Sequence, residues 1–91
     1  MAKSTIQFGT SFECMGYECK PYKNTENVED YGVDIYENGE YICTCPQMTQ
    51  DTINCDTIRK EFKMNGINVD PWAHWNEKTF GKNWRDLYNG L

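Results

Sequence analysis

The sequence contains few of the residues and motifs on which catalysis depends. It has a single histidine, His74, and no glycine-rich loop that would hold a phosphate. No stretch of about 18 apolar residues occurs, which excludes a membrane-spanning helix, and we expect no membrane partner. The first residues lack an apolar segment, so we also expect no secretory signal peptide and a cytoplasmic location, in the host cell if a phage encodes the chain.

Basic residues are missing from the middle of the chain. The chain holds 14 acidic and 9 basic residues, a net charge of −5, yet residues 24–56 contain neither lysine nor arginine. The acidic residues in that stretch are Glu26, Glu29, Asp30, Asp34, Glu37, Glu40, Asp51 and Asp56. Without bases this stretch cannot neutralise phosphates, which argues against direct binding of nucleic acid. The stretch is either a solvated acidic face or a negative patch directed at a basic partner surface.

A chain of 91 residues forms one small domain, residues 1–91, because chains of this size rarely divide into separately packed cores. Only 38% of the residues are hydrophobic and 14% are aromatic, so aromatic rings must supply much of the buried area. We interpret the aromatic residues of the C-terminal segment mainly as core, with an exposed ring as an anchor for a protein interface. Stacking of nucleic-acid bases on these rings is the less favoured alternative.

The clearest local signal is a β-hairpin between residues 31 and 45. Asn38-Gly39 is the preferred dipeptide for a two-residue type I′ turn, in which both central residues need a positive φ. With that turn, Glu37 faces Glu40 and strict alternation continues along both strands. The predicted core face carries Val33, Ile35, Ile42 and Thr44, and the opposite face carries Asp34, Tyr36, Tyr41, Cys43 and Cys45.

A second hairpin is predicted upstream of the first. Residues 4–14 have the pattern of a strand, Met15-Gly16 is a turn dipeptide, and a return strand follows through Tyr22. The proline at position 21 favours an edge or short strand, since proline cannot donate a ladder hydrogen bond.

Two helices are predicted in the second half of the chain. The first begins at an N-cap on Thr49 and runs to about residue 65. Gly66 follows its end and is expected in the left-handed conformation. Asp70-Pro71 predicts the start of the second helix, which Gly81 interrupts. The expected fold class is α+β, with a three- or four-stranded antiparallel sheet of two hairpins followed by two helices packed on one face.

The five cysteines allow three interpretations. Their odd number and the missing leader favour unpaired thiols in a reducing compartment, and we expect no cofactor. One or two disulfides, joining Cys14 or Cys19 to Cys43 or Cys45, are an alternative. A zinc site formed by these four cysteines is another, although the C-x4-C and C-x-C spacings match zinc knuckles poorly. The fifth cysteine, Cys55, lies in the first predicted helix.

Catalytic groupings are sparse, and we expect no enzyme activity. A cysteine nucleophile would need His74 beside it and a third group to orient the imidazole, and nothing near His74 in the sequence indicates such a group. The acidic residues lie in a predicted hairpin and loop, not in a cleft with apolar walls that would raise a carboxyl pKa. A cysteine-dependent enzyme is therefore the least favoured interpretation.

We interpret the acidic middle of the chain as a surface that binds a protein. Carboxylates along a hairpin imitate a row of phosphates and steer association with a basic surface, such as a nucleic-acid-binding groove. The predicted partner-binding residues are Glu26, Glu29, Asp30, Asp34, Tyr36, Glu37, Glu40 and Tyr41. In size and charge the chain resembles phage anti-defence proteins, including anti-CRISPR inhibitors, which implies an inhibitor or adaptor that docks on a nucleic-acid-handling enzyme. The alternative is a small interaction domain that a zinc site or disulfide bonds stabilise.

Overall fold

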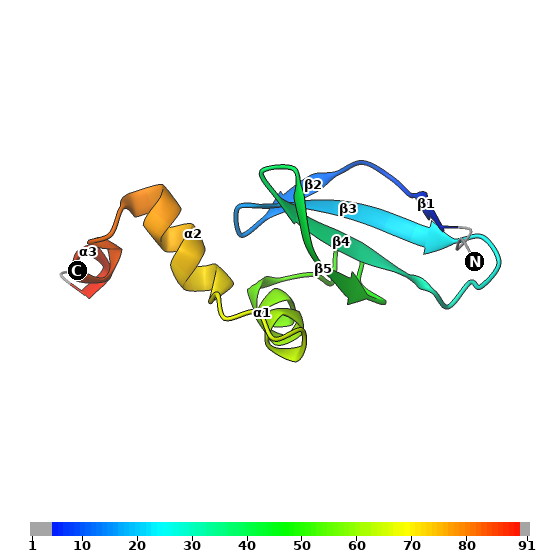
Figure 1. Cartoon of the computed structure of the whole chain (residues 1–91). Coiled ribbons are helices and arrows are strands. Elements are labelled where there is room, and N and C mark those ends of the chain that lie inside the picture. Colours follow the sequence, from blue (N-terminus) through cyan, green and yellow to red (C-terminus); the bar gives the residue numbers. More distant parts are fainter. Residues whose placement is uncertain (1–4, 90–91) are drawn as a thin grey trace.

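One antiparallel sheet is followed by helices, which confirms the expected α+β class (Figure 1). The computed structural model describes residues 5–89. Its elements are β1 (Thr5–Gln7), β2 (Phe12–Cys14), β3 (Tyr17–Asn24), β4 (Tyr31–Glu37), β5 (Glu40–Pro46), α1 (Cys55–Met64), α2 (Pro71–Phe80) and α3 (Trp84–Asn89). Among residues 5–89, no helix has both the length and the apolar character needed to cross a membrane.

The sheet has five strands because the predicted N-terminal strand is interrupted. β1 and β2 both pair antiparallel with β3, and the order continues through β4 to β5. Between β1 and β2 the chain leaves the ladder at Gly9, which has a φ of 85°. The Met15-Gly16 turn forms as predicted, with φ values of 55° and 79°. The two hairpins therefore pair with each other through β3 and β4. The expectation of a short or edge strand at Pro21 is wrong, because β3 has eight residues and lies inside the sheet.

The second hairpin contains a β-bulge, and the predicted register of its strands is therefore wrong beyond the turn. Asn38 and Gly39 form the expected turn with positive φ, and Tyr36 pairs with Tyr41. Beyond that pair the register shifts by one residue, so that Ile35 pairs with Cys43. A bulge sets two residues of one strand against one of its partner, and every later side chain of β5 changes face. Cys43 and Cys45 therefore join the core, and Thr44 lies on the opposite face.

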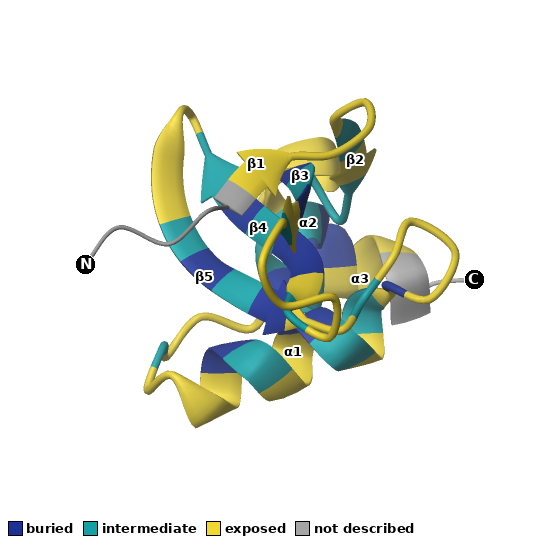
Figure 2. Cartoon of the chain, turned by 90° about the vertical axis from the view of Figure 1, so that its right-hand side faces the viewer, coloured by how far each residue is buried: buried dark blue, intermediate teal, exposed yellow. Residues whose placement is uncertain are grey.

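The hydrophobic core lies between α1 and one face of the sheet, which we call the inner face. Cys19, Val33, Ile35, Cys43 and Cys45 supply the sheet side of this core. The helix side consists of Ile58 and Phe62, which lie four residues apart on one face of α1 and are both buried. Figure 2 shows the buried residues on β4, on β5 and on the side of α1 that faces them. Within residues 5–89, no helix lies against the other face of the sheet, which we call the outer face (Figure 1).

Helix α1 begins later than predicted. Thr49 accepts from the backbone of Thr52 in a turn and is not the N-cap, which is Asn54. The Asn54 side chain accepts from the Thr57 backbone while the Thr57 hydroxyl accepts from the Asn54 backbone, a reciprocal capping box. This box satisfies two donors of the first helical turn and outweighs the single hydroxyl that Thr49 offers.

Helices α2 and α3 extend beyond the end of the sheet that carries the Asn38-Gly39 turn, and the molecule measures 52 × 26 × 22 Å (Figure 1). Asp70 caps α2 as predicted, accepting from the backbone of Trp72 at 3.0 Å. Trp72 packs edge-on against Trp84 with ring centroids 5.0 Å apart, and Trp75 packs against Phe80 at 6.0 Å. The Trp72–Trp84 contact therefore joins α2 to α3, whereas the Trp75–Phe80 contact lies within α2 and leaves Phe80 55% exposed.

Candidate functional site

The outer face of the sheet carries a transverse row of four residues, Glu13, Glu18, Tyr36 and Tyr41. Glu13 pairs with Glu18, Glu18 with Tyr36, and Tyr36 with Tyr41, so one residue from each of β2, β3, β4 and β5 lies in line. Residues paired directly across strands point to the same face. Both glutamates are exposed, and the Tyr41 side chain is 54% exposed. We call these four residues the outer-face row.

A shallow hollow lies beside the two glutamates of the outer-face row. Its volume is about 430 Å³, and its lining residues are Ser11, Phe12, Glu13, Gly16, Glu18 and Asn38. Like charges directly opposite each other destabilise a sheet. Glu18 is partly compensated by Lys20, whose Nζ lies 3.8 Å from Glu18 Oε1. The hollow thus presents two carboxylates at its wall, and a cationic side chain would relieve their repulsion.

The two tyrosines of the outer-face row are held in place by their neighbours. Tyr36 and Tyr41 meet edge to face with centroids 5.7 Å apart, and Lys20 Nζ lies 4.4 Å from the centre of the Tyr36 ring. The Tyr41 hydroxyl lies 2.6 Å from the Thr44 hydroxyl, which in turn donates to Asp34 at 2.7 Å. Asp34 is therefore engaged inside the hairpin, whereas the tyrosine rings form a fixed aromatic surface.

The tip of the second hairpin carries Glu37 and Glu40, which face each other as predicted. Glu37 turns toward the helices: its Oε2 accepts from His74 Nε2 at 2.6 Å and from Lys78 Nζ at 3.2 Å. Partial burial alone would raise the pKa of Glu37, but the two hydrogen bonds and the charges of His74 and Lys78 outweigh it and hold the pKa below its ordinary value. Glu40 stays exposed, so the tip presents one solvated carboxylate.

Three further residues that were predicted to bind a partner lie in the loop between β3 and β4, namely Glu26, Glu29 and Asp30. Asp30 accepts from the Asn24 side chain at 3.0 Å and from the Tyr22 hydroxyl at 3.4 Å. Burial, and after it the charge of Asp30, raises the pKa of Tyr22 to about 12. At roughly 3.3 Å per residue, β4 places this loop about 20 Å from Glu37.

The eight predicted partner-binding residues therefore divide into two groups at opposite ends of β4. Asp34, Tyr36, Tyr41 and the tip glutamates lie together on the second hairpin, and the loop residues lie apart from them. Glu13 and Glu18 were missed because the sequence reasoning concentrated on the base-free stretch. The signal was nevertheless present, since a two-residue turn at Met15-Gly16 sets position 13 opposite position 18.

The cysteines are brought together in the core as free thiols. Cys19, Cys43 and Cys45 are buried, and Cys14 and Cys55 are partly exposed. Burial raises the pKa of Cys14 and Cys55, and it raises that of Cys19 to about 12. A hydrogen bond between Cys43 and Cys45 lowers the pKa of Cys43 and raises that of Cys45. Within residues 5–89, no three side chains of His, Cys, Asp or Glu are placed to hold a metal ion.

The only histidine occupies a structural position. His74 Nε2 is engaged by Glu37, and the imidazole packs against the Tyr17 ring at a centroid distance of 6.0 Å. Tyr17 is itself buried against Phe62, which links His74 to the core. The geometry that distinguishes this chain is thus an α+β domain whose sheet has an uncovered, partly acidic outer face.

Comparison of the chain with family models, with curated proteins and with solved structures finds no match.

Proposed function

We propose that the protein is a non-enzymatic binding domain whose outer-face row docks on a basic surface of a partner protein. The observation that carries this proposal is the pair of opposed, exposed glutamates, Glu13 and Glu18, at the wall of a hollow. The pair costs stability in the free protein, and the cost falls when a lysine or arginine of a partner lies between the carboxylates.

The tyrosines beside the glutamates support the same surface. Tyr36 and Tyr41 hold each other edge to face, Lys20 lies over the Tyr36 ring, and the Tyr41 hydroxyl is hydrogen-bonded to Thr44, so the two rings lose little conformational entropy on binding. Tyrosine is enriched among residues that dominate binding energy. The exposed tip residue Glu40 extends the negative potential at the edge of the row.

The partner class that fits these residues is a protein that handles nucleic acid. The surface that such a protein offers to phosphates is rich in lysine and arginine, and spaced carboxylates occupy it in place of phosphates. The resemblance in size and charge to phage anti-defence inhibitors makes nucleic-acid-guided nucleases the first partners to test. In this role the protein acts as an inhibitor, because its docking excludes the nucleic acid.

The test compares two double variants with the same net charge against a panel of purified nucleic-acid-guided nucleases. Glu13→Gln with Glu18→Gln removes the opposed carboxylates, and Glu77→Gln with Asp86→Asn removes two exposed carboxylates of α2 and α3. We expect the first variant to weaken binding at least about tenfold and to flatten its salt dependence, with the second within about twofold of wild type.

Three results would contradict the proposal. Equal weakening by both variants would mean that net charge alone drives binding. Binding that neither variant nor salt changes would remove the outer-face row from the interface. Absence of binding to every basic partner in the panel would leave the assignment of this partner class without support.

A further inference from the structure

The inner face of the sheet is covered by α1 only over part of its length. The row formed by Ile6, Lys23 and Tyr31, at the end of the sheet opposite the Asn38-Gly39 turn, lies outside the core. Ile6 is 47% exposed and Tyr31 is 36% exposed. A part of the inner face that the helices would otherwise cover is therefore open to solvent.

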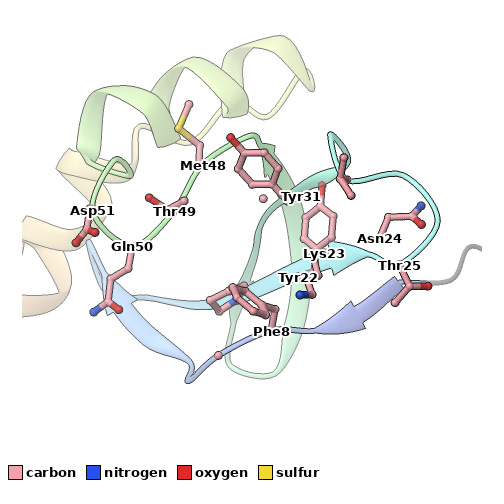
Figure 3. Close-up of a pocket in the computed structure, with 14 residues that line it drawn as sticks. Phe8, Tyr22, Lys23, Asn24, Thr25, Tyr31, Met48, Thr49, Gln50 and Asp51 are labelled. Atoms are coloured by element: carbon pink, nitrogen blue, oxygen red, sulfur yellow. The ribbon is translucent and has the colours of Figure 1, made fainter.

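A groove of about 670 Å³ occupies this open part of the inner face. Its apolar lining includes Phe8, Tyr31 and Met48, which Figure 3 labels. The loop between β3 and β4, which contributes Val28, forms one wall, and the segment after β5, which contributes Met48, forms the other. Phe8 is 53% exposed and Val28 is 87% exposed. The volume is in the range of pockets that take a small molecule or an anchoring side chain. Contiguous exposed apolar surface of this kind marks interaction sites.

The charges around the groove have one predominant sign. Both walls come from the stretch of residues 24–56 that contains no lysine or arginine. Asp51 lines the wall that carries Met48, and Glu29, which is exposed, belongs to the loop that carries Val28. The one base among the lining residues of the described chain is Lys23, whose Nζ lies 4.5 Å from the centre of the Phe8 ring. Lys23 and Asp51 are therefore the charged residues that line the groove, and the excess of negative charge beside it comes from the β3–β4 loop, which carries Glu26, Glu29 and Asp30.

We propose that this groove binds a large apolar side chain of a basic peptide segment in a partner protein. The apolar side chain packs on Phe8, Tyr31 and Met48, and flanking lysines or arginines lie near Asp51 and Glu29. Nucleic acid is a poor fit, because residues 24–56, which supply both walls, contain no base that could neutralise phosphates. The groove lies on the inner face and the outer-face row on the other, so this site is independent of the proposed function.

The test uses the full-length, ¹⁵N-labelled protein and three blocked hexapeptides. The probe has a central leucine–tryptophan pair flanked by two lysines on each side. One control peptide has glutamates in place of the lysines, and the other has glycines in place of the apolar pair. We expect saturable amide shifts around Phe8, Tyr31 and Met48 with the probe, and affinity at least about tenfold weaker with either control peptide.

Phe8→Ser is tested against Phe80→Ser as a matched control. The two phenylalanines are 53% and 55% exposed, each has one aromatic or cationic neighbour, and only Phe8 lines the groove. We expect Phe8→Ser to weaken probe binding about tenfold or more, and Phe80→Ser to leave it within about twofold. A circular dichroism spectrum identical to wild type establishes that each variant is folded.

Several outcomes would overturn the inference. Equal shifts with all three peptides, or shifts confined to the outer face, would remove the groove as the binding site. Co-sedimentation of the protein with phosphatidylcholine vesicles, abolished by Phe8→Ser, would make the occupant a lipid surface. A dimer in analytical ultracentrifugation that Phe8→Ser dissociates would make the occupant a second copy of the chain.

Discussion

Glu37, the last residue of β4, accepts a 2.6 Å hydrogen bond from Nε2 of His74 in α2. Lys78, one helical turn further along α2, donates to the same carboxylate oxygen at 3.2 Å. The hairpin tip and α2 are 37 residues apart in the sequence, and this carboxylate joins them. Trp75, between these two helix residues, lies against Gly16 in the turn of the first hairpin, so one face of α2 contacts both turns.

The first prediction concerns the acid stability of this contact. The pKa of Glu37 lies below its usual 4.5 in the folded protein, so the folded state binds fewer protons than the unfolded state. Its contribution to stability is therefore full above about pH 4.5 and is lost as the pH falls through the folded pKa. We expect Glu37→Gln to lower the unfolding free energy at pH 7 and to reduce its fall between pH 5 and 3, measured by urea denaturation.

Glu40→Gln is the matched control for this prediction. Glu40 faces Glu37 across the turn and undergoes the same chemical change, but its side chain is exposed. We expect its substitution to leave the fall in unfolding free energy between pH 5 and 3 as large as in wild type. The unfolding free energy at pH 7 should stay within about 0.5 kcal/mol of wild type. If the unfolding free energy of Glu37→Gln falls between pH 5 and 3 as much as that of wild type, the Glu37 carboxylate does not contribute to the pH dependence.

The second prediction concerns Gly32 in the centre of the sheet. A methyl group on Gly32 would overlap the backbone oxygen of Cys45 and lie 3.0 Å from Pro46 Cα and 3.1 Å from the Tyr22 ring. Backbone atoms cannot move away without breaking the β4–β5 ladder, so we expect Gly32→Ala to cost about 3 kcal/mol, read from chemical denaturation.

Gly9→Ala separates the steric cost from the cost of backbone conformation. Gly9 has a φ of 85°, and a methyl group there meets nothing within 4 Å. Its substitution should cost about 1 kcal/mol, the penalty for a left-handed backbone. If Gly32→Ala lowers the unfolding free energy no more than Gly9→Ala does, the Cys45 backbone does not lie as close to Gly32 as described.

The third prediction separates two roles of Asp70. Its carboxylate caps α2 through the backbone of Trp72 and also accepts from Arg59, whose Nη2 lies 3.2 Å away. Asp70→Ala removes both interactions and should cost about 1–2 kcal/mol, whereas Asp70→Asn keeps the cap. The Arg59 pair is half-exposed, and such pairs contribute below about 1 kcal/mol. Thermal unfolding that ranks the two variants as equal would assign the effect to the ion pair.

The fourth prediction concerns the thiols. Cys14, Cys19, Cys45 and Cys55 have raised pKa values, and Cys43, whose pKa is lowered, is only 2% exposed. Because the thiolate is the reactive form, we expect iodoacetamide to modify all five slowly in the native protein and rapidly in urea. One thiol with a fast native reaction would favour a cysteine-dependent enzyme. Stoichiometric zinc in protein purified reduced and without chelator would favour the zinc site instead.

Local signals in the sequence predicted the elements whose cause is local. Asn38-Gly39, Met15-Gly16 and Asp70-Pro71 each satisfy a backbone requirement within a few residues, and the structure has each of them where it was expected. The predicted start of α1 was wrong because Thr49 and Asn54 are both acceptable N-cap residues. The choice between them depends on the Thr57 hydroxyl and on which residues then face the sheet.

The bulge in β5 shows what the alternating pattern leaves undetermined. Either register places two β5 residues on the face of Val33 and Ile35, Ile42 with Thr44 or Cys43 with Cys45, and alternation alone does not choose between them. The packing of α1 on the sheet decides between them, since the cysteine side chains are small enough to let Ile58 and Phe62 approach. That contact lies between segments distant in the chain, so no local pattern records it.

The amino-acid sequence by itself determined the fold class, the two hairpin turns and the acidic character of residues 24–56, because composition and backbone preference act over short distances. Only the tertiary structure decided where those charges lie. It engages Glu37 with α2, separates the β3–β4 loop from the hairpin tip, and sets Glu13 opposite Glu18 on the outer face. The reason is that a side chain's neighbours across a sheet follow from strand pairing and register, which packing of the whole chain selects.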